Sequence, residues 1–187
     1  MELLVISGST RRGSFNTRLA RLVRDVRPDD QVTVVSDLAA LPFYDADVEA
    51  TGIPSAVTAL RGAVAVADVV VFVTPEYNGT VPGVLGNAVD WLSRPHGESV
   101  LQRKPVLVLS ASPSRFGAVR AADHLRTVLH RIGAQVLPAG LSVAGAHRRL
   151  AEPVDPEVVG QLADVLGSVL DVRTAPSGSA EPDLLPA

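Results

Sequence analysis

The sequence contains no cysteine and no excess of positive charge. Without cysteine, a disulfide framework, a cysteine-ligated zinc site and a thiol nucleophile are excluded. The 17 Lys and Arg residues face 20 Asp and Glu residues, for a net charge of -3, so the chain as a whole does not attract nucleic acid or anionic lipid. No run comes near the roughly 18 consecutive apolar residues of a membrane-spanning helix. We therefore expect neither a nucleic-acid partner nor a membrane partner.

Metal ligands in a suitable pattern are also lacking. The spacing typical of a metal site is absent from the four histidines, His96, His124, His130 and His147. We therefore expect no metal. A secretory signal would carry positive charge near its start, but the second residue is Glu2, which favours a cytoplasmic protein.

The chain does have enough apolar material for one core. Its 187 residues are 47% hydrophobic, and a chain of this length buries roughly 70% of the surface that it exposes when unfolded. We expect one domain over residues 1–173. Residues 174–187 are rich in Pro, Ser, Gly and acidic side chains and are predicted to be disordered.

Short runs rich in Val, Ile and Leu alternate with segments of helical period, a pattern typical of an α/β fold with a parallel sheet. The runs occupy residues 3–6, 32–35, 69–73, 106–109 and 134–137. The segments of helical period occupy residues 15–26, 54–66, 82–92, 117–132 and 156–170. Residues 36–52 are expected to form an ordered excursion rather than a linker. Ligands of an open parallel sheet bind beyond the carboxyl ends of its strands, so the loops there are the candidates for a site.

The loop after the first run reads SGSTRRGSFN. It brings hydroxyls, an amide and the guanidiniums of Arg11 and Arg12 to the start of a helix, where free N–H groups and the helix dipole favour an anion such as phosphate. The patterns of a P-loop and of a dinucleotide-binding loop are both missing, so a mononucleotide fits better. The structural alternative is that Ser14 only caps the helix and both arginines are solvated. Three further arginines, Arg18, Arg21 and Arg24, are assigned to a polar helix face.

The loop after the third run reads TPEYNGTVPG. Its prolines and glycines fix the backbone, and an aromatic side chain with exposed peptide groups suits a flat heterocycle. The alternative, equally favoured by spacing, is a tight turn at Asn78 and Gly79 with Tyr77 covering the core. A third, less specific loop, SASPSRFG at residues 110–117, follows the fourth run. In a sheet ordered 2-1-3-4-5 these three loops converge on one crevice.

These residues resemble the NAD(P)H-dependent FMN reductases of flavodoxin-like fold, a family that includes bacterial quinone and chromate reductases. GSTRRGSFN at residues 8–16 is similar to the family's phosphate loop, and PEYNGTVPGVLGNAVDWLSRP at residues 75–95 is similar to its flavin loop. PFYDADVE and KPVLVLSASPSRFGAVRAADHLR are also similar, so the resemblance runs from residue 3 to about residue 138. The chain departs from the family pattern at Gly86, where Lys is usual, and at Ala118, where a paired glycine is common.

The resemblance implies a three-layer α/β sandwich with a five-stranded parallel sheet in the order 2-1-3-4-5. It implies a phosphate and ribityl site made by Ser9, Arg11, Ser14 and Asn16, in a loop shaped by Thr10, Arg12, Gly13 and Phe15. It also implies a place for the isoalloxazine, lined mostly by backbone groups of Pro75, Glu76, Tyr77, Asn78 and Gly79, with Ser112 from the third loop.

The function implied by the resemblance is that of an FMN-dependent NAD(P)H oxidoreductase. Hydride would pass from nicotinamide C4 to flavin N5 and on to a quinone-like, chromate or other small acceptor. FMN is then the cofactor and NAD(P)H the co-substrate, and since the cofactor carries the chemistry we name no catalytic side chain. The resemblance also implies a homodimer or tetramer. The alternative is an FMN-binding electron carrier or redox sensor without a productive nicotinamide site, although Arg11 favours the reductase because flavodoxins have a Thr-rich phosphate loop without arginine.

Overall fold

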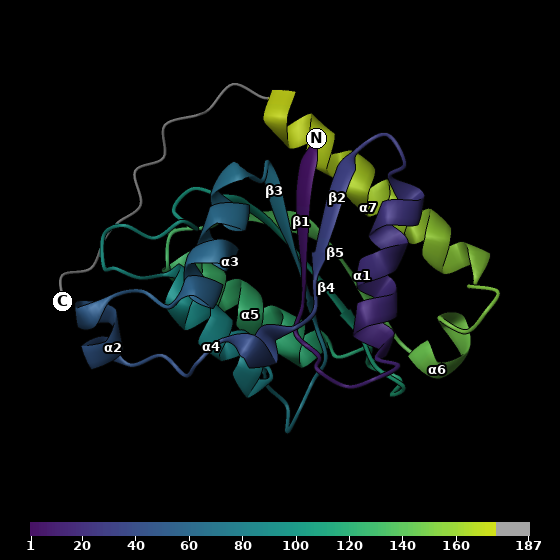
Figure 1. Cartoon of the computed structure of the whole chain (residues 1–187). Coiled ribbons are helices and arrows are strands. Elements are labelled where there is room, and N and C mark those ends of the chain that lie inside the picture. Colours follow the sequence, from purple (N-terminus) through teal and green to yellow (C-terminus); the bar gives the residue numbers. More distant parts are fainter. Residues whose placement is uncertain (175–187) are drawn as a thin grey trace.

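A single sheet of five parallel strands runs through the centre of the protein (Figure 1). The computed structural model describes residues 1–174. The strand order is β2-β1-β3-β4-β5, which confirms the predicted parallel sheet and its order. The strands are β1 (Glu2–Ser7), β2 (Gln31–Val35), β3 (Val69–Thr74), β4 (Pro105–Ala111) and β5 (Gln135–Val143).

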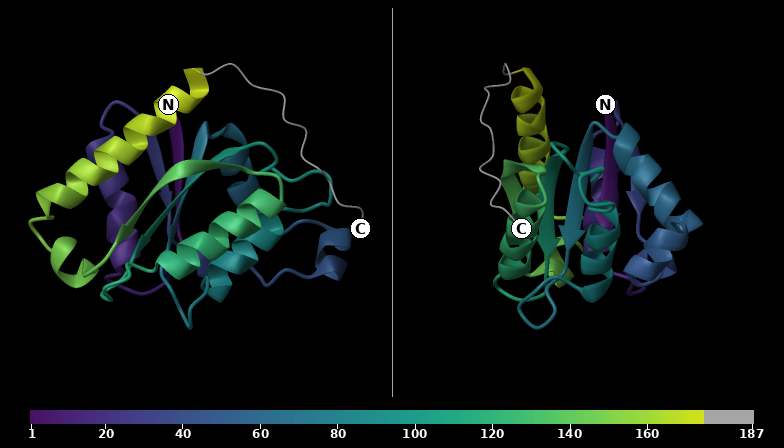
Figure 2. Two further views of the ribbon diagram at one scale, coloured as in Figure 1. Left: turned by 180° about the vertical axis from the view of Figure 1, so that it is seen from behind. Right: turned by 90° about the vertical axis from the view of Figure 1, so that its left-hand side faces the viewer.

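Helices cover both faces of the sheet, which gives the predicted three-layer sandwich (Figure 2). One face is covered by α1 (Phe15–Val26) and α7 (Pro156–Thr174). The other is covered by α3 (Ser55–Val66), α4 (Gly83–Leu92) and α5 (Val119–Arg131). Each of these helices was predicted to within a few residues.

The inner strands β1, β3 and β4 are buried over nearly their whole length, because helices pack on both of their faces. Alternating side chains divide between the two sides of the sheet. Leu3 and Val5 join the core cluster that includes α1 and α7, whereas Leu4 and Ile6 join the cluster that includes α3, α4 and α5. The two clusters pack the helices against the sheet from both faces. The carboxyl ends of the parallel strands therefore lie together at one edge of the sheet.

Strand β5 is longer than the predicted run of residues 134–137. Its pairing with β4 is irregular, because Val106 pairs with Val136 but Val108 pairs with Gly140. Arg126 of α5 enters this irregularity and donates to the carbonyl of Val108 at 3.1 Å. A Cβ on Gly140 would lie 2.8 Å from the backbone oxygen of Val108, so a larger residue there would have to shift the backbone.

Residues 36–52 form the predicted ordered excursion. They contain a 3-10 turn, η1 (Leu38–Ala40), and a short helix, α2 (Ala46–Thr51), which the sequence did not predict. The carbonyl of Pro42 accepts hydrogen bonds from Trp91 Nε1 at 2.8 Å and from Asn87 Nδ2 at 2.9 Å. Asn87 Oδ1 accepts the Tyr44 N–H at 2.7 Å. The excursion is therefore bonded directly to α4.

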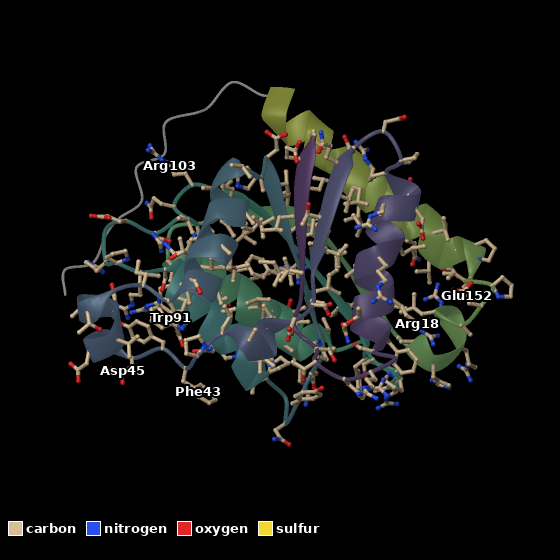
Figure 3. The ribbon with its side chains drawn as sticks, viewed as in Figure 1. Arg18, Phe43, Asp45, Trp91, Arg103 and Glu152 are labelled. Atoms are coloured by element: carbon tan, nitrogen blue, oxygen red, sulfur yellow. The ribbon has the colours of Figure 1, made fainter. Side chains whose placement is uncertain are left out.

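Trp91 is 1% exposed and is a core residue. Figure 3 shows Trp91 and Asp45 on one side of the sheet and Arg18 of α1 on the other.

The chain after β5 forms the short helix α6 (Ala146–Arg149) and then α7, which extends the predicted helix of residues 156–170. Apart from Thr174, which ends α7, the disorder predicted for residues 174–187 falls outside the described residues. No helix within residues 1–174 combines the length and the apolar content needed to cross a membrane.

Candidate functional site

The loop from β1 to α1 is fixed at its start by a close approach to α4. The Gly8 N–H donates to the carbonyl of Val73 at 2.8 Å, and a Cβ on Gly8 would lie 2.7 Å from the Leu85 Cδ2 atom. Ser7 also ties the loop to α1, because its hydroxyl lies 2.9 Å from that of Thr17. These contacts therefore fix the path of the loop from the end of β1 to the start of α1.

The end of this loop is a tight turn that leads into the helix. The Ser14 N–H donates to the carbonyl of Arg11 at 3.2 Å, and Gly13 has a φ of 66°, a conformation that glycine adopts without strain. Ser14 caps α1 by accepting the Thr17 N–H at 3.3 Å, as the structural alternative predicted. Its hydroxyl proton stays available to a ligand, so capping and anion binding are compatible.

Arg11 is exposed, and its guanidinium lies 5.3 Å from the centre of the Phe15 ring. Its hydrogen bond to the carbonyl of Gly13 is long, at 3.4 Å. These contacts hold the arginine loosely beside the turn, where its other donors are free to meet an anion.

Asn16 is 3% exposed and is already occupied by a structural role. Its Nδ2 donates to the carbonyl of Ala111 at 2.9 Å, and its Oδ1 accepts the Ala111 N–H at 3.0 Å. The side chain thus joins the start of α1 to the end of β4. These contacts position the loop, and the second Nδ2 hydrogen remains for the ligand-binding role that the resemblance implies.

The loop after β3, which resembles the family's flavin loop, forms a narrow hairpin. Tyr77 and Thr80 exchange backbone hydrogen bonds of 3.1 Å in both directions, and the two residues between them, Asn78 and Gly79, have φ values of 54° and 78°. Two positive φ values at an Asn-Gly pair are typical of a type I′ turn. The predicted turn is confirmed, but Tyr77 is 49% exposed, so the alternative in which it covers the core is wrong.

The hairpin is also tied to α5, because Thr80 Oγ1 lies 2.6 Å from His124 Nδ1. This contact restrains the hairpin against α5. A rigid hairpin with an exposed tyrosine at its base suits a flat ligand better than a mobile loop does.

The third loop, between β4 and α5, depends on two consecutive left-handed residues. Gly117 and Ala118 have φ values of 61° and 66°, and Ser110 Oγ donates to the carbonyl of Gly117 at 2.7 Å. A Cβ on Gly117 would lie 2.9 Å from the backbone nitrogen of Ala144. Ala118 therefore adopts a left-handed conformation, which glycine adopts more readily than alanine.

Nine of the residues suggested by the sequence line one cavity of about 240 Å³, between the three loops. These are Ser9, Arg11, Ser14, Phe15, Asn16, Pro75, Glu76, Tyr77 and Ser112. Ala111 and Pro113 line it as well. The Oε2 atom of Glu76 is buried and has no hydrogen-bond partner within residues 1–174. The cavity thus offers an unpaired carboxylate oxygen next to hydroxyls and a guanidinium.

A second cavity of about 300 Å³ is also lined by the loop between β1 and α1. It contains the remaining loop residues, Thr10, Arg12 and Gly13, and shares Ser9, Arg11 and Ser14 with the first cavity. Thr17, Arg18, Arg21 and Ser36 complete its lining, and these four residues were not among the predicted site residues. The signal that could have found the two arginines is their position three residues apart on one face of the helix, in a stretch without acidic residues. Asn78 and Gly79 line neither cavity.

Comparisons with known proteins point to one family. A family model described as NADPH-dependent FMN reductase matches residues 1–148. The chain is 39% identical over 163 residues to a quinone reductase from Escherichia coli (strain K12), and the match covers 86% of each protein. It is 42% identical over 129 residues to an NAD(P)H-dependent FMN reductase from Pseudomonas aeruginosa, covering 69% of each. A solved structure of a flavoenzyme NAD(P)H:(acceptor) oxidoreductase from Paracoccus denitrificans superposes with a TM-score of 0.76 at 26% identity, covering 90% of this chain and 97% of that one.

Proposed function

The chain belongs to the NADPH-dependent FMN reductase family, and on that premise we propose that it transfers hydride from NAD(P)H through bound FMN to a small acceptor. Quinones are the proposed acceptors, because the relative from Escherichia coli is a quinone reductase. Chromate and other small oxidants are further proposed acceptors. The observation that carries the proposal is the first cavity, in which three loops from the carboxyl ends of β1, β3 and β4 meet.

The residues of the first cavity fit FMN. The start of α1 offers N–H groups and the positive end of the helix dipole to a phosphate, and Ser9, Arg11 and Ser14 add two hydroxyls and a guanidinium. The unpaired Glu76 oxygen suits a ligand that brings its own donors, and FMN brings ribityl hydroxyls and a ring N–H. We therefore propose that these residues, with Phe15, Pro75, Tyr77 and Ser112, hold FMN.

The chemistry that FMN would supply when bound is the acceptance of hydride and its release as electrons to the acceptor. The protein's own part is to bind and orient. The hairpin of residues 77–80 would fix the backbone beside the ring. Because Tyr77 and Thr80 use their N–H groups on each other, the N–H groups of Asn78 and Gly79 are the ones we propose for stabilising negative charge at the ring edge. Asn16 is a further proposed contact of FMN through its second Nδ2 hydrogen, while its bonds to Ala111 hold the phosphate loop against the end of β4.

Three coarser features belong to the same proposal. Residues 1–173 act as one FMN-binding domain, since the described strands share one sheet. A homodimer or tetramer would use the helices after Pro82 and Gly117 as contacts, and the exposed Tyr77, Phe116 and Val119 give this region apolar surface. The use of NAD(P)H supports a cytoplasmic location.

The proposal is tested with purified protein and free flavins. The protein should bind one FMN per chain and discriminate against FAD, because the phosphate loop ends at a helix start and lacks the dinucleotide pattern. Binding is measured by absorption of the protein-bound flavin after removal of excess FMN. Anaerobic addition of NADH or NADPH should then bleach this absorption much faster than it bleaches free FMN.

Two outcomes would contradict the proposal. A protein that takes up no flavin would overturn it altogether. A protein that binds FMN but accelerates its reduction by neither NADH nor NADPH would be an electron carrier or redox sensor instead.

A further inference from the structure

The hairpin of residues 77–80 carries two backbone donors that the protein leaves free. The N–H groups of Tyr77 and Thr80 donate to each other's carbonyls at 3.1 Å. Within residues 1–174, the N–H groups of Asn78 and Gly79 make no hydrogen bond, and both residues are exposed. They follow Tyr77, which lines the first cavity, so these two donors lie next to the place proposed for FMN.

The turn itself has little packing. A Cβ on Gly79 would have no neighbouring atom within 4 Å, and a two-stranded hairpin alone is only marginally stable in water. The chain after the turn is anchored by Val81, which packs against the core cluster that includes α3, α4 and α5. The direction of the two free donors therefore depends on what fastens the hairpin to the rest of the protein.

One side-chain hydrogen bond fastens the hairpin to α5. Thr80 Oγ1 lies 2.6 Å from His124 Nδ1, and in the described part of the chain no other side chain of residues 77–80 is hydrogen-bonded. Helix α5 is a firm support, because its buried Leu125 and Leu129 belong to the core. A neutral imidazole accepts the Thr80 hydroxyl at Nδ1, and a charged one donates to the hydroxyl oxygen, so both ring forms make the bond.

His124 has no comparable role elsewhere in the fold. Its side chain is exposed, so the ring contributes little to the core. None of the ion pairs found within residues 1–174 includes it. The bond to Thr80 is therefore the structural contribution that its ring makes.

A fixed hairpin would affect the two redox forms of FMN differently. Donors that are held in place before charge develops stabilise that charge without reorganisation. Reduced FMN carries more negative charge at its ring edge than oxidised FMN does, so fixed N–H groups would bind the reduced form more tightly. The reduction potential of the bound flavin would then be higher than with a loose hairpin.

We propose that His124 is a positioning residue, which through Thr80 holds the N–H groups of Asn78 and Gly79 where they stabilise reduced FMN. This inference rests on the proposed function, because it requires FMN to lie beside the hairpin.

Hydrogen exchange of the flavin-free protein tests the contact without the cofactor. The Tyr77 and Thr80 amides exchange when the hairpin opens, and nuclear magnetic resonance resolves them singly. His124→Ala should accelerate their exchange about twofold to tenfold, the effect of losing one hydrogen bond. The matched control is His130→Ala, because His130 is an exposed histidine of the same helix while the hairpin is bonded to His124. It should leave the exchange unchanged.

The hydroxyl of Thr80 is tested with two further variants. Thr80→Val removes the hydroxyl and keeps the shape of the side chain, so it should accelerate exchange as His124→Ala does. Thr80→Ser keeps a hydroxyl and should behave like the unaltered protein. In the double variant with His124→Ala and Thr80→Val the two losses should not add, because one hydrogen bond joins the two residues.

The reduction potential of bound FMN gives the readout at the ligand. In His124→Ala and in Thr80→Val, the affinity for reduced FMN should fall about twofold to tenfold relative to that for oxidised FMN. This change lowers the two-electron potential by about 9 to 30 mV. Equilibration with a dye of known potential measures it, and Thr80→Ser and His130→Ala should keep the potential of the unaltered protein.

Three results would overturn the inference alone: unchanged exchange in His124→Ala, equal effects of His124→Ala and His130→Ala, and additive losses in the double variant. Faster exchange with an unchanged potential would overturn it as well, because the hairpin would then not act on the flavin. In each of these cases the unaltered protein still binds FMN and the proposed function stands. If the unaltered protein takes up no FMN, the proposed function itself fails and the inference falls with it.

Discussion

Arg11 contacts the protein so loosely that its charge is available to a ligand. Its ring contact to Phe15 and its long bond to Gly13 contribute little to packing, since an exposed arginine keeps most of its rotamer freedom. Arg11→Ala should therefore leave the fold intact and weaken FMN binding by about 1.5 to 3 kcal/mol, or about tenfold to a hundredfold. Fluorescence titration of the flavin-free protein measures this affinity.

Riboflavin is the control for Arg11, because it has the ring and the ribityl chain but no phosphate. Its affinity should hardly change in Arg11→Ala. Equal losses for FMN and riboflavin would mean that Arg11 acts by shaping the loop and not through the phosphate.

Gly117 and its neighbour Ala118 share a left-handed conformation but differ in what surrounds them. Gly117→Ala adds about 1 to 2 kcal/mol of backbone strain and brings a Cβ to 2.9 Å from backbone atoms, so it should destabilise the protein by at least about 2 kcal/mol. In Ala118→Gly, the relief of strain is offset by the loss of a buried methyl worth about 0.8 kcal/mol. The free energy of unfolding should then change by less than about 1 kcal/mol.

Urea denaturation of both variants, without flavin, decides this comparison. If both variants lose similar amounts of unfolding free energy, the close backbone approach at Gly117 is not what distinguishes the two positions.

Local features of single residues could be predicted from the sequence, whereas their long-range contacts could not. The cap at Ser14 and the turn at Asn78 and Gly79 follow from local chemistry and could be predicted. The role of Asn16 could not, because its partner Ala111 lies 95 positions away, and nothing in the local sequence names that partner. Tyr77 is similar: its exposure depends on how the hairpin leans on α5, which is a tertiary property.

At the scale of elements, the excursion of residues 36–52 is bonded twice to the Asn87 side chain of α4. Asn87→Ala removes two hydrogen bonds, to Pro42 and Tyr44, each worth about 1 kcal/mol, and leaves the Trp91 bond. Amide hydrogen exchange should become faster in residues 41–51 and stay unchanged in the sheet. Mass spectrometry of exchanged peptides measures both.

Asp90→Asn is a suitable control for Asn87→Ala, since Asp90 lies on the same helix and is exposed. It should leave the exchange of residues 41–51 as it is. If Asn87→Ala accelerates exchange throughout the protein, Asn87 stabilises the whole core and has no special role in the excursion.

The larger elements could be predicted because their periodicity is strong. Three inner strands and five long helices follow from runs of apolar residues, which tertiary packing then reinforces. The end of β5 could not be predicted, because Pro138 and Gly140 interrupt the apolar run and are typical breakers of strands. The short helices α2 and α6 lack the length for a recognisable period, and contacts with the rest of the fold stabilise them.

At the scale of the whole molecule, the three loops form one crevice at one edge of the sheet. Nicotinamide and acceptor would then have to use the same place beside the flavin in turn. Steady-state rates at several fixed concentrations of NADPH, with a quinone varied, should give parallel double-reciprocal lines, as in a ping-pong cycle. Intersecting lines would mean that both substrates are bound at once and would point to a separate acceptor site.

From the bonds between Asn16 and Ala111 we also expect a consequence for folding. The phosphate loop is tied to the end of a strand that enters the chain 95 residues later, so its local turn and cap are not anchored to the sheet edge through Asn16 until β4 is in place. Long-range contacts of this kind form late, because the intervening chain must first lose its freedom. FMN uptake is therefore a late step in maturation, and a nascent chain that ends before β4 has no site for the cofactor.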